Sequence, residues 1–264
     1  MKPGIHADVS EAEYHARPEL SQSQAKTILD CPARYIWERD HPTPPTPQME
    51  AGTVIHALTL GQPDTHQVID APSKRGKAWA DAADAARAAG LIPVLPDELA
   101  TYQACAAAVH DHPWVAAAMT RGRAEQTMTW TDPDTGVPCR GRVDWLTATS
   151  DGAPVIVDLK TTASVEGGDR AWAATVARYG YHVQAGAYTH GHEVITGDAP
   201  TFFMVAVERT PPHLVRVWQP TPDTVQRGHD RWADALTIHR QCTDTGHWPA
   251  YPTNPVPFDL PAWA

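Results

Sequence analysis

The sequence predicts one domain of the α/β class, in which a central mixed β-sheet is flanked by helices. Three observations predict this. Helical patterns fill the first part of the chain, adjacent strand patterns follow within residues 125–160, and helical and strand patterns alternate after that. Helices followed by the order β-β-β-α-β-β-α are typical of a sheet with helices packed on its faces. At 264 residues the chain can bury one sizeable core, and nothing in it requires a second domain.

We expect three parts within this domain. Residues 1–120 are mainly helical, residues 121–220 form the sheet core, and residues 221–264 form a C-terminal helix and an extended, proline-rich arm. In the first part, PTPPTP is a stiff connector between the first two helices, and Gly90 and Pro113 end the next two. The expected helices there are 21–38, 49–61, 78–90 and 98–113.

The second half of the chain begins with the strands of 125–160. After them we expect one or two helices over 169–191, a hairpin of 201–210 with 213–220, and a long amphipathic helix over 221–242.

The stretch GRVDWLTATSDGAPVIVDLKTT carries the most informative motif. VIVDL reads as a strand, CRGRVDWLTA reads as another, and SDGAP supplies the turn between them. Asp158 and Lys160 are two residues apart and share one side of a strand, and pairing across the hairpin brings Asp144 to the same side. Two carboxylates and an ammonium suit phosphodiester hydrolysis, because hard oxygen ligands bind Mg²⁺ and the ammonium orients or activates the attacking water. The alternative is an edge hairpin with solvated charges.

Two further segments carry polar residues of interest. Gln184 and Tyr188 are four residues apart on an expected helix, where they contact a water, a phosphate or the nucleic-acid backbone, or else form the polar stripe of an amphipathic helix. His56 lies among small and apolar residues, as either a packed core histidine or a metal ligand.

The order of these motifs, a G-x-x-x-H helix, a strand aspartate, a D-x-K strand and a Q-x-x-x-Y helix, resembles the PD-(D/E)XK nuclease superfamily. More narrowly, it resembles the RecB-like and phage exonuclease VIII (RecE-type) branch. LSQSQAKTILDCPARYIWE is similar to the opening helix of that branch, AEQTMTWTDPDTGVPCRGRVD to its lead-in to the first catalytic strand, and WPAYPTNPVPFDLPAWA to its tail. The resemblance implies a restriction-endonuclease-like core.

The resemblance also implies roles for residues. It assigns four metal ligands, namely Asp144, Asp158, the carbonyl of Leu159, and His56. Lys160 is implied as the catalytic lysine, and Gln184 and Tyr188 as supporting residues. Glu125 has two interpretations. It is either a site carboxylate, which supports the metal ligands or binds a second metal, or a solvated residue of an exposed strand. Asp158 stands where several relatives have glutamate, which has a longer reach but the same ligand chemistry.

The implied activity is that of a Mg²⁺-dependent (or Mn²⁺-dependent) exonuclease on linear double-stranded DNA. It degrades one strand from 5′ to 3′ and leaves 3′ single-stranded tails for phage-type recombination. The implied partners are double-stranded DNA ends, a single-strand annealing protein and further copies of the chain in a ring. The alternatives are a RecB-like single-strand nuclease or endonuclease in DNA repair or defence, and a catalytically inactive DNA-end-binding module. A metal-binding protein without nuclease activity ranks last, because the 14 histidines are dispersed.

The net charge of −10 requires that any DNA contact be local. Lys74, Arg75 and Lys77 form one basic group, which is a DNA contact or a solvated loop. Arg140 and Arg142 form another beside Asp144, where Arg142 holds a phosphate or neutralises the acidic cluster.

Cysteine spacing and hydropathy give further expectations. The four cysteines are scattered without a C-x-x-C pair, so neither a disulfide framework nor an iron–sulfur cluster is expected. No apolar run is long enough for a membrane span and the first residues are polar, so no membrane partner is expected. We expect the protein in the bacterial cytoplasm, encoded by a phage or prophage.

Overall fold

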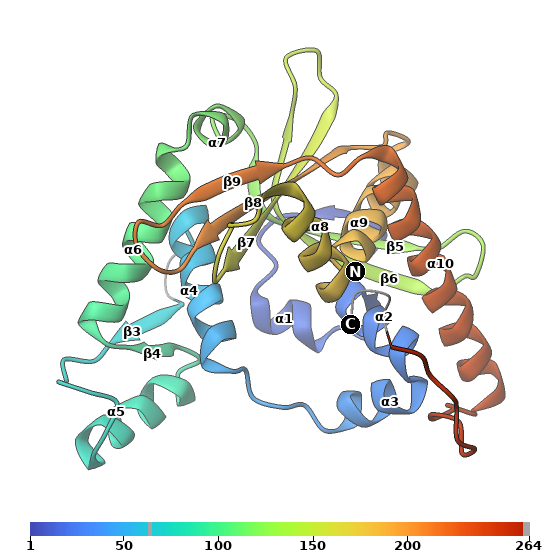
Figure 1. The fold of residues 1–264 in the computed structure, drawn as a ribbon, viewed down its shortest axis with the longest axis horizontal. Helices are drawn as coiled ribbons and strands as arrows, with labels where there is room; N and C mark the ends of the chain where they lie inside the picture. Colours follow the sequence, from blue (N-terminus) through green and yellow to red (C-terminus); the bar gives the residue numbers. More distant parts are fainter. Residues whose placement is uncertain (63–64, 261–264) are drawn as a thin grey trace.

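A computed structural model describes residues 1–62 and 65–260 of the chain. Its main feature is a mixed seven-stranded sheet flanked by helices, as the sequence predicts (Figure 1). The strands of this sheet are β1 (Gly4–His6), β2 (Leu20–Ser21), β5 (Arg123–Thr131), β6 (Pro138–Ala148), β7 (Pro154–Thr162), β8 (Thr201–Glu208) and β9 (Val215–Trp218). The helices are α1 (Glu11–Ala16), α2 (Gln22–Asp30), α3 (Pro32–Asp40), α4 (Pro47–Leu60), α5 (Lys77–Ala88), α6 (Pro96–Asp111), α7 (Pro113–Ala118), α8 (Gly168–Tyr179), α9 (Tyr181–Thr196) and α10 (Pro222–Thr245).

The strand order is β1-β5-β6-β7-β8-β9. β2 pairs with β6 at Cys139 and Arg140, near the start of that strand. Neighbours on this path are antiparallel except β7 and β8, which run parallel and are connected through α8 and α9. A parallel pair needs such a crossover, so the helices between β7 and β8 lie against the sheet. This crossover brings α9 next to the D-x-K motif.

Each face of the sheet has its own apolar core. Alternation along β7 divides the residues between the cores: Ile156 packs with residues of α2, α9 and α10, whereas Val157 and Leu159 pack with α4, α6 and α7. Figure 1 shows α4 and α6 on the opposite side of the molecule from α10. The β7 residues Asp158 and Lys160 belong to the face that α9 covers.

A small second unit lies at one end of the molecule (Figure 1). It consists of α5 and the parallel pair β3 (His66–Val68) and β4 (Ile92–Val94). Ile69, Trp79 and Ala83 form its own apolar cluster. The sequence did not predict β3 and β4, because three-residue strands carry too little alternation to be distinguished from loop.

The single helix predicted over 21–38 is wrong in one respect, since the structure divides it into α2 and α3. Cys31 is extended, with φ −161° and ψ 106°, and Pro32 opens α3. A proline disfavours helical backbone at the preceding residue and its own nitrogen cannot donate a hydrogen bond, so the helix ends there and a new one begins. Ser21 caps α2 through a reciprocal capping box with Gln24.

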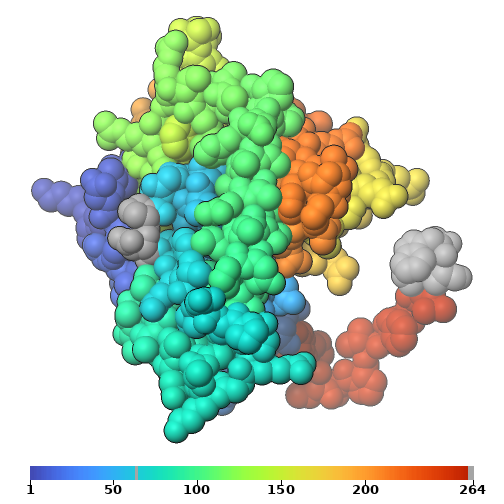
Figure 2. Space-filling view, turned by 90° about the vertical axis from the view of Figure 1, so that its left-hand side faces the viewer, coloured from blue at the N-terminus to red at the C-terminus, as the bar shows by residue number. Residues whose placement is uncertain are grey.

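Within the described residues 246–260, the arm after α10 is anchored at its start. The Trp248 ring lies 5.3 Å from that of Tyr35, and the Tyr251 hydroxyl donates a hydrogen bond to Asp30. Phe258 is 86% exposed, and Figure 2 shows the arm, in red, extending away from the body. The last four residues of the expected arm, 261–264, lie outside the described part of the chain.

Two glycines allow α9 and α10 to cross at close range. A Cβ added at Gly228 would lie 1.8 Å from the His182 carbonyl oxygen, and one at Gly186 would lie 2.2 Å from the His229 nitrogen. The α9 residues that face the sheet therefore depend on this contact for their position.

We predict that Gly228→Ala destabilises the protein by about 1–3 kcal/mol or more, because the methyl group meets backbone that can move only if the helices separate. Gln226→Ala, on the exposed side of α10, should change stability by less than about 0.5 kcal/mol. Urea unfolding of both variants measures the difference. Equal stability of the two variants would contradict the assigned helix contact.

Candidate active site

The candidate site lies where β6 and β7 separate. Their backbone pairing runs from Ala148 with Pro154 to Trp145 with Val157 and goes no further. The next residues, Asp144 and Asp158, are not ladder partners. Leu159, which continues β7, instead donates its N–H to Asp144 Oδ2 at 2.6 Å. A carboxylate thus replaces the backbone acceptor, and the sheet opens at the D-x-K motif.

Asp158, Lys160 and Gln184 form a closed polar ring on the α9 face of β7. Gln184 Nε2 donates to Asp158 Oδ1 at 2.6 Å, and Lys160 Nζ donates to Gln184 Oε1 at 2.9 Å. Lys160 Nζ also lies 2.5 Å from Asp158 Oδ2. The Asp158 side chain is 1% exposed and that of Lys160 is 13% exposed. Buried charges persist only with such partners, so these three side chains hold one another in place.

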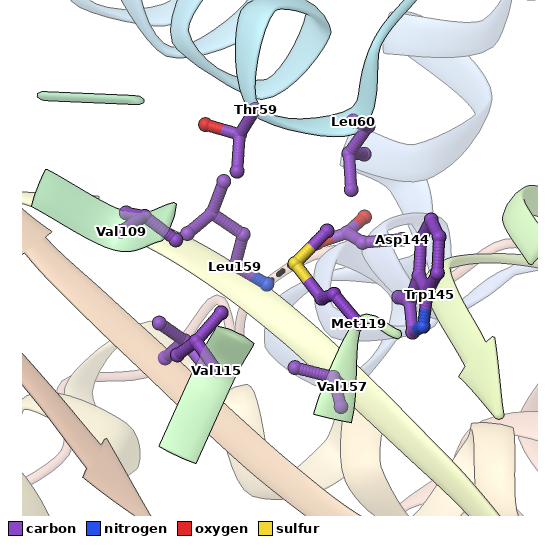
Figure 3. A pocket seen from close by; sticks show the side chains of 10 residues that line it. Thr59, Leu60, Val109, Val115, Met119, Asp144, Trp145, Val157 and Leu159 are labelled. Carbon is purple, nitrogen blue, oxygen red and sulfur yellow. Dashed lines mark hydrogen bonds between the residues drawn. The ribbon is translucent and has the colours of Figure 1, made fainter. Parts of the chain in front are cut away.

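Asp144, which the sequence predicted on the same side of the sheet as Asp158 and Lys160, instead lies at the opening on the α4 side, together with His56. His56 Nδ1 lies 3.7 Å from Asp144 Oδ2, on the helix that packs against β6 and β7. Asp144 also lines an apolar pocket with Leu60, Met119 and Leu159 (Figure 3). His56, for which the sequence allowed either a packed core histidine or a metal ligand, therefore lies beside a carboxylate.

Burial and charge shift the pKa values of these groups. Burial raises the pKa of Asp158 to about 6, with the charge of Asp144 adding to the effect, and burial also raises the pKa of Asp144. For His56, burial and then the charge of Lys160 lower the pKa to about 4. Burial opposes the charged form of Lys160, but Asp158 and Asp144 outweigh it and raise the pKa of that lysine. The histidine is therefore neutral, as metal ligation by nitrogen requires.

The donor set fits a divalent cation that prefers oxygen. Asp158 Oδ2 is buried and accepts no hydrogen bond of good geometry, despite the nearby ammonium. Within residues 1–62 and 65–260, however, no three His, Cys, Asp or Glu side chains converge as a ready-made cage. Asp158 and Asp144 each direct oxygens to protein donors, so a shared ion requires at least one of them to exchange a hydrogen bond for a metal bond.

Glu125 lies beside this group in a strained backbone position, with φ +50°. Arg142 Nη1 lies 3.5 Å from Glu125 Oε2. Burial, followed by the charge of Asp144, raises the pKa of Glu125 to about 7. Of the two interpretations of Glu125, the geometry favours a carboxylate behind Asp144 over a solvated strand residue.

The structure places the guanidinium groups of Arg140 and Arg142 against protein atoms, and the ion pair of Arg142 with Glu125 favours the alternative that Arg142 neutralises the acidic cluster. Arg140 is 4% exposed and donates to the backbone oxygen of Arg17. Arg142 donates to the carbonyl oxygens of Val9 and Ser10 and lies 4.5 Å over the ring of Tyr14. Both guanidinium groups attach the N-terminal segment to β6.

Tyr188 is likewise not placed to contact a nucleic acid. It is 4% exposed, and a Cβ at Gly141 would lie 2.8 Å from its ring. Burial raises the pKa of Tyr188 well above its usual value. This side chain packs α9 against β6 and so supports Gln184 one turn earlier on the helix.

The basic group at Lys74, Arg75 and Lys77 belongs to the segment that leads into α5, in the small unit at the end of the molecule (Figure 1). Lys74 Nζ lies 2.7 Å from Glu98 Oε1. These residues are not brought to the opening between β6 and β7, and the structure favours the solvated-loop interpretation.

Two residues beside the site, Lys26 and Tyr181, were not among those that the sequence predicted. Lys26 on α2 is close enough for its charge and that of Lys160 to affect each other, and the ring centroid of Tyr181 lies 4.7 Å from Lys160 Nζ. The Y-G-Y sequence at 179–181, with its glycine between two aromatic residues, is the signal that marks this turn.

Comparison with known proteins identifies the fold. A family model described as a PDDEXK-like domain of unknown function (DUF3799) matches residues 21–254. The crystal structure of a candidate exonuclease from Eubacterium rectale superposes with a TM-score of 0.67 at 15% identity, covering 98% of this chain and 97% of that one. A second structure, of SSO0001, has a TM-score of 0.40 and 13% identity, covering 90% of this chain and 81% of that one. No curated protein matches significantly.

Among the described residues, none of the helices has the length and apolar character needed to cross a membrane.

We predict that Glu125→Gln stabilises the metal-free protein at pH 8 by about 1–3 kcal/mol and has little effect at pH 4.5. Because the folded-state pKa of Glu125 is raised to about 7, the folded protein binds that proton more tightly than the unfolded chain does. This contribution of Glu125 to the free energy of unfolding is fully present below about pH 4.5. It is lost as the pH rises through about 7. Urea unfolding in EDTA at both pH values measures this.

Glu166→Gln removes an exposed carboxylate and is the matched control, with no difference expected between the two pH values. If Glu125→Gln is equally or more destabilising at pH 8, the assigned environment of Glu125 is wrong.

Proposed function

The chain belongs to the PDDEXK-like family of the preceding comparison, and we propose that it is a divalent-metal-dependent deoxyribonuclease that hydrolyses phosphodiester bonds. The observation that carries this proposal is the meeting of Asp144, Asp158 and Lys160 where β6 and β7 separate. A buried ion pair between neighbouring strand residues is costly to maintain. Such pairs with shifted pKa values are more common at functional sites than elsewhere.

Asp144 and Asp158 are the proposed metal ligands, with the Leu159 carbonyl and His56 completing the set. The Leu159 N–H points toward Asp144, and the backbone of Leu159 also supports the protonated form of His56. These contacts place the backbone edge of β7 that is not paired with β6 between the side chains of Asp144 and His56. A divalent cation bound there would acidify a water molecule and offset charge on the phosphate.

Lys160 is the proposed catalytic lysine. Its ammonium, fixed by Asp158 and Gln184, donates to the attacking water or to the phosphate oxygens as negative charge develops. Gln184 acts through its two hydrogen bonds as a positioning residue. It keeps Asp158 and Lys160 at a constant separation without adding charge.

The proposed substrate is linear double-stranded DNA, with Mg²⁺ or Mn²⁺ as the metal. We propose degradation of one strand from the 5′ end to leave a 3′ single-stranded tail, which an annealing protein receives in phage-type recombination. Support comes from the RecE-type motifs in the sequence and from the similar fold of the E. rectale protein, which is named as a candidate exonuclease. A ring of several copies around the DNA belongs to the same proposal.

The contacts among the side chains of Asp158, Lys160 and Gln184 argue against a catalytically inactive end-binding module. Binding a DNA end gains nothing from a carboxylate that is 1% exposed, whereas hydrolysis needs both the ligand and the ammonium. A single-strand nuclease or endonuclease uses the same chemistry and differs only in the substrate.

We expect the wild type to release the 5′ label from linear duplex DNA in Mg²⁺ or Mn²⁺ but not in EDTA, and to leave a closed circle intact. Lys160→Ala should reduce the rate by at least about 100-fold, because it removes a proton donor placed at the reaction centre. Arg240→Ala, which removes an exposed cation on α10, is the control and should retain the rate.

Gel analysis of DNA labelled separately at its 5′ and 3′ ends follows both the rate and the polarity. Release of the 3′ label first would overturn the polarity, and cutting of the circle would identify an endonuclease. Binding without cleavage in either metal would overturn the proposal that the protein is a nuclease.

A further inference from the structure

An aromatic and basic strip leads away from the candidate site along the junction of α8 and α9. We name it the α8–α9 strip, and it comprises Lys26, Arg178, Tyr179 and Tyr181. The rings of Tyr179 and Tyr181 stack with centroids 5.6 Å apart and planes inclined by 21°. Tyr179 is 52% exposed, so one aromatic ring of the pair is open to solvent.

Cations accompany both rings. Lys160 Nζ lies 4.7 Å from the Tyr181 centroid, and the Arg178 guanidinium lies 5.7 Å from that of Tyr179. The strip therefore begins at the catalytic lysine and alternates charge with aromatic surface. An acidic protein with a net charge of −10 needs such a local group to attract a polyanion.

Lys26 adds a cation that lacks a carboxylate partner. Its ammonium donates to the Tyr179 carbonyl oxygen at 3.1 Å, and no Asp or Glu of the described residues forms an ion pair with it. Burial, followed by the charge of Lys160, lowers the pKa of Lys26 to about 8. An arriving phosphate would supply the missing negative charge.

Gly180 fixes the lysine to the strip. Its φ of +65° turns the chain from α8 into α9, and an added Cβ would lie 2.6 Å from Lys26 Cδ. The aliphatic part of Lys26 therefore packs on the turn between the two tyrosines. Stem and ammonium are held together, so the charge stays beside the aromatic rings.

We propose that the α8–α9 strip binds the single-stranded portion of the DNA strand that enters the site. A base stacks on Tyr179 while Lys26 and Arg178 contact phosphates. Exposed aromatic rings between cations are the recurrent way to bind unpaired nucleic acid without regard to sequence. An acidic peptide would use the cations but leave the open tyrosine ring without a matching group. This inference rests on the proposed nuclease function and specifies how its substrate is held.

The test measures binding of a fluorescent single-stranded oligonucleotide of mixed sequence to the full chain in EDTA, where metal-dependent cleavage is absent. Tyr179→Ala should weaken binding at least about fivefold through lost stacking. Tyr251→Ala removes a tyrosine of nearly equal exposure, 54%, from the C-terminal arm and should bind as the wild type does.

Charge is tested separately through the salt dependence. Lys26→Met should lower the slope of log Kd against log salt by about 0.7, because one phosphate contact is lost on a single strand. Lys26→Arg should preserve the slope, whereas Arg240→Ala removes a distant cation and should leave it unchanged. A general folding defect would weaken binding without this selective loss of slope, and thermal melting of each variant checks for it.

The outcomes separate the two proposals. If the wild type digests DNA but Tyr179→Ala and Lys26→Met bind as it does, with the same slope, the strip is not the binding surface and the nuclease proposal stands. If the wild type neither binds nor digests DNA, both proposals are overturned. Selective weakening by both variants supports the strip.

Discussion

The arrangement of the site depends on one constraint, the loss of backbone pairing between β6 and β7 beyond Trp145 and Val157. From that point the N–H of Leu159 needs another acceptor, because a buried unpaired donor is costly. Asp144 supplies it at 2.6 Å. The same separation frees the side chain of Asp158 to meet Gln184 and Lys160. The end of the β6–β7 ladder therefore forms the opening, and charged residues of both strands line it.

The buried charges of this site lower the stability of the folded protein locally. Asp158 is buried and has a pKa raised to about 6, so its charged form is held against desolvation by Lys160 and by one amide hydrogen bond. Replacement of such a pair by apolar residues is often neutral or stabilising. Its presence is therefore better explained by chemistry than by folding. The close contact between α9 and α10 at their glycines holds Gln184 opposite β7.

Sequence patterns predicted the features that depend on local periodicity and short-range chemistry. The three strands around Asp144 and Asp158, the crossover helices and the D-x-K motif were visible because each shows its pattern within a few residues. The use of Arg140 could not be predicted, because its partner, the Arg17 carbonyl, lies 123 positions away. The contact of Lys26 with the Tyr179 backbone spans 153 positions. Contacts of this kind arise from the topology of the sheet, which the strand patterns alone do not specify.

If Asp144 and Asp158 share one divalent cation, titration calorimetry with Mn²⁺ should show that binding depends on both carboxylates. Asp144→Asn and Asp158→Asn should each weaken binding at least about tenfold, and the loss in the double variant should differ from the sum of the two single losses, because residues that share one ion are energetically coupled. Asp223→Asn, an exposed change on α10, should bind as the wild type does. Full Mn²⁺ affinity in either single site variant would show that the two carboxylates do not share an ion.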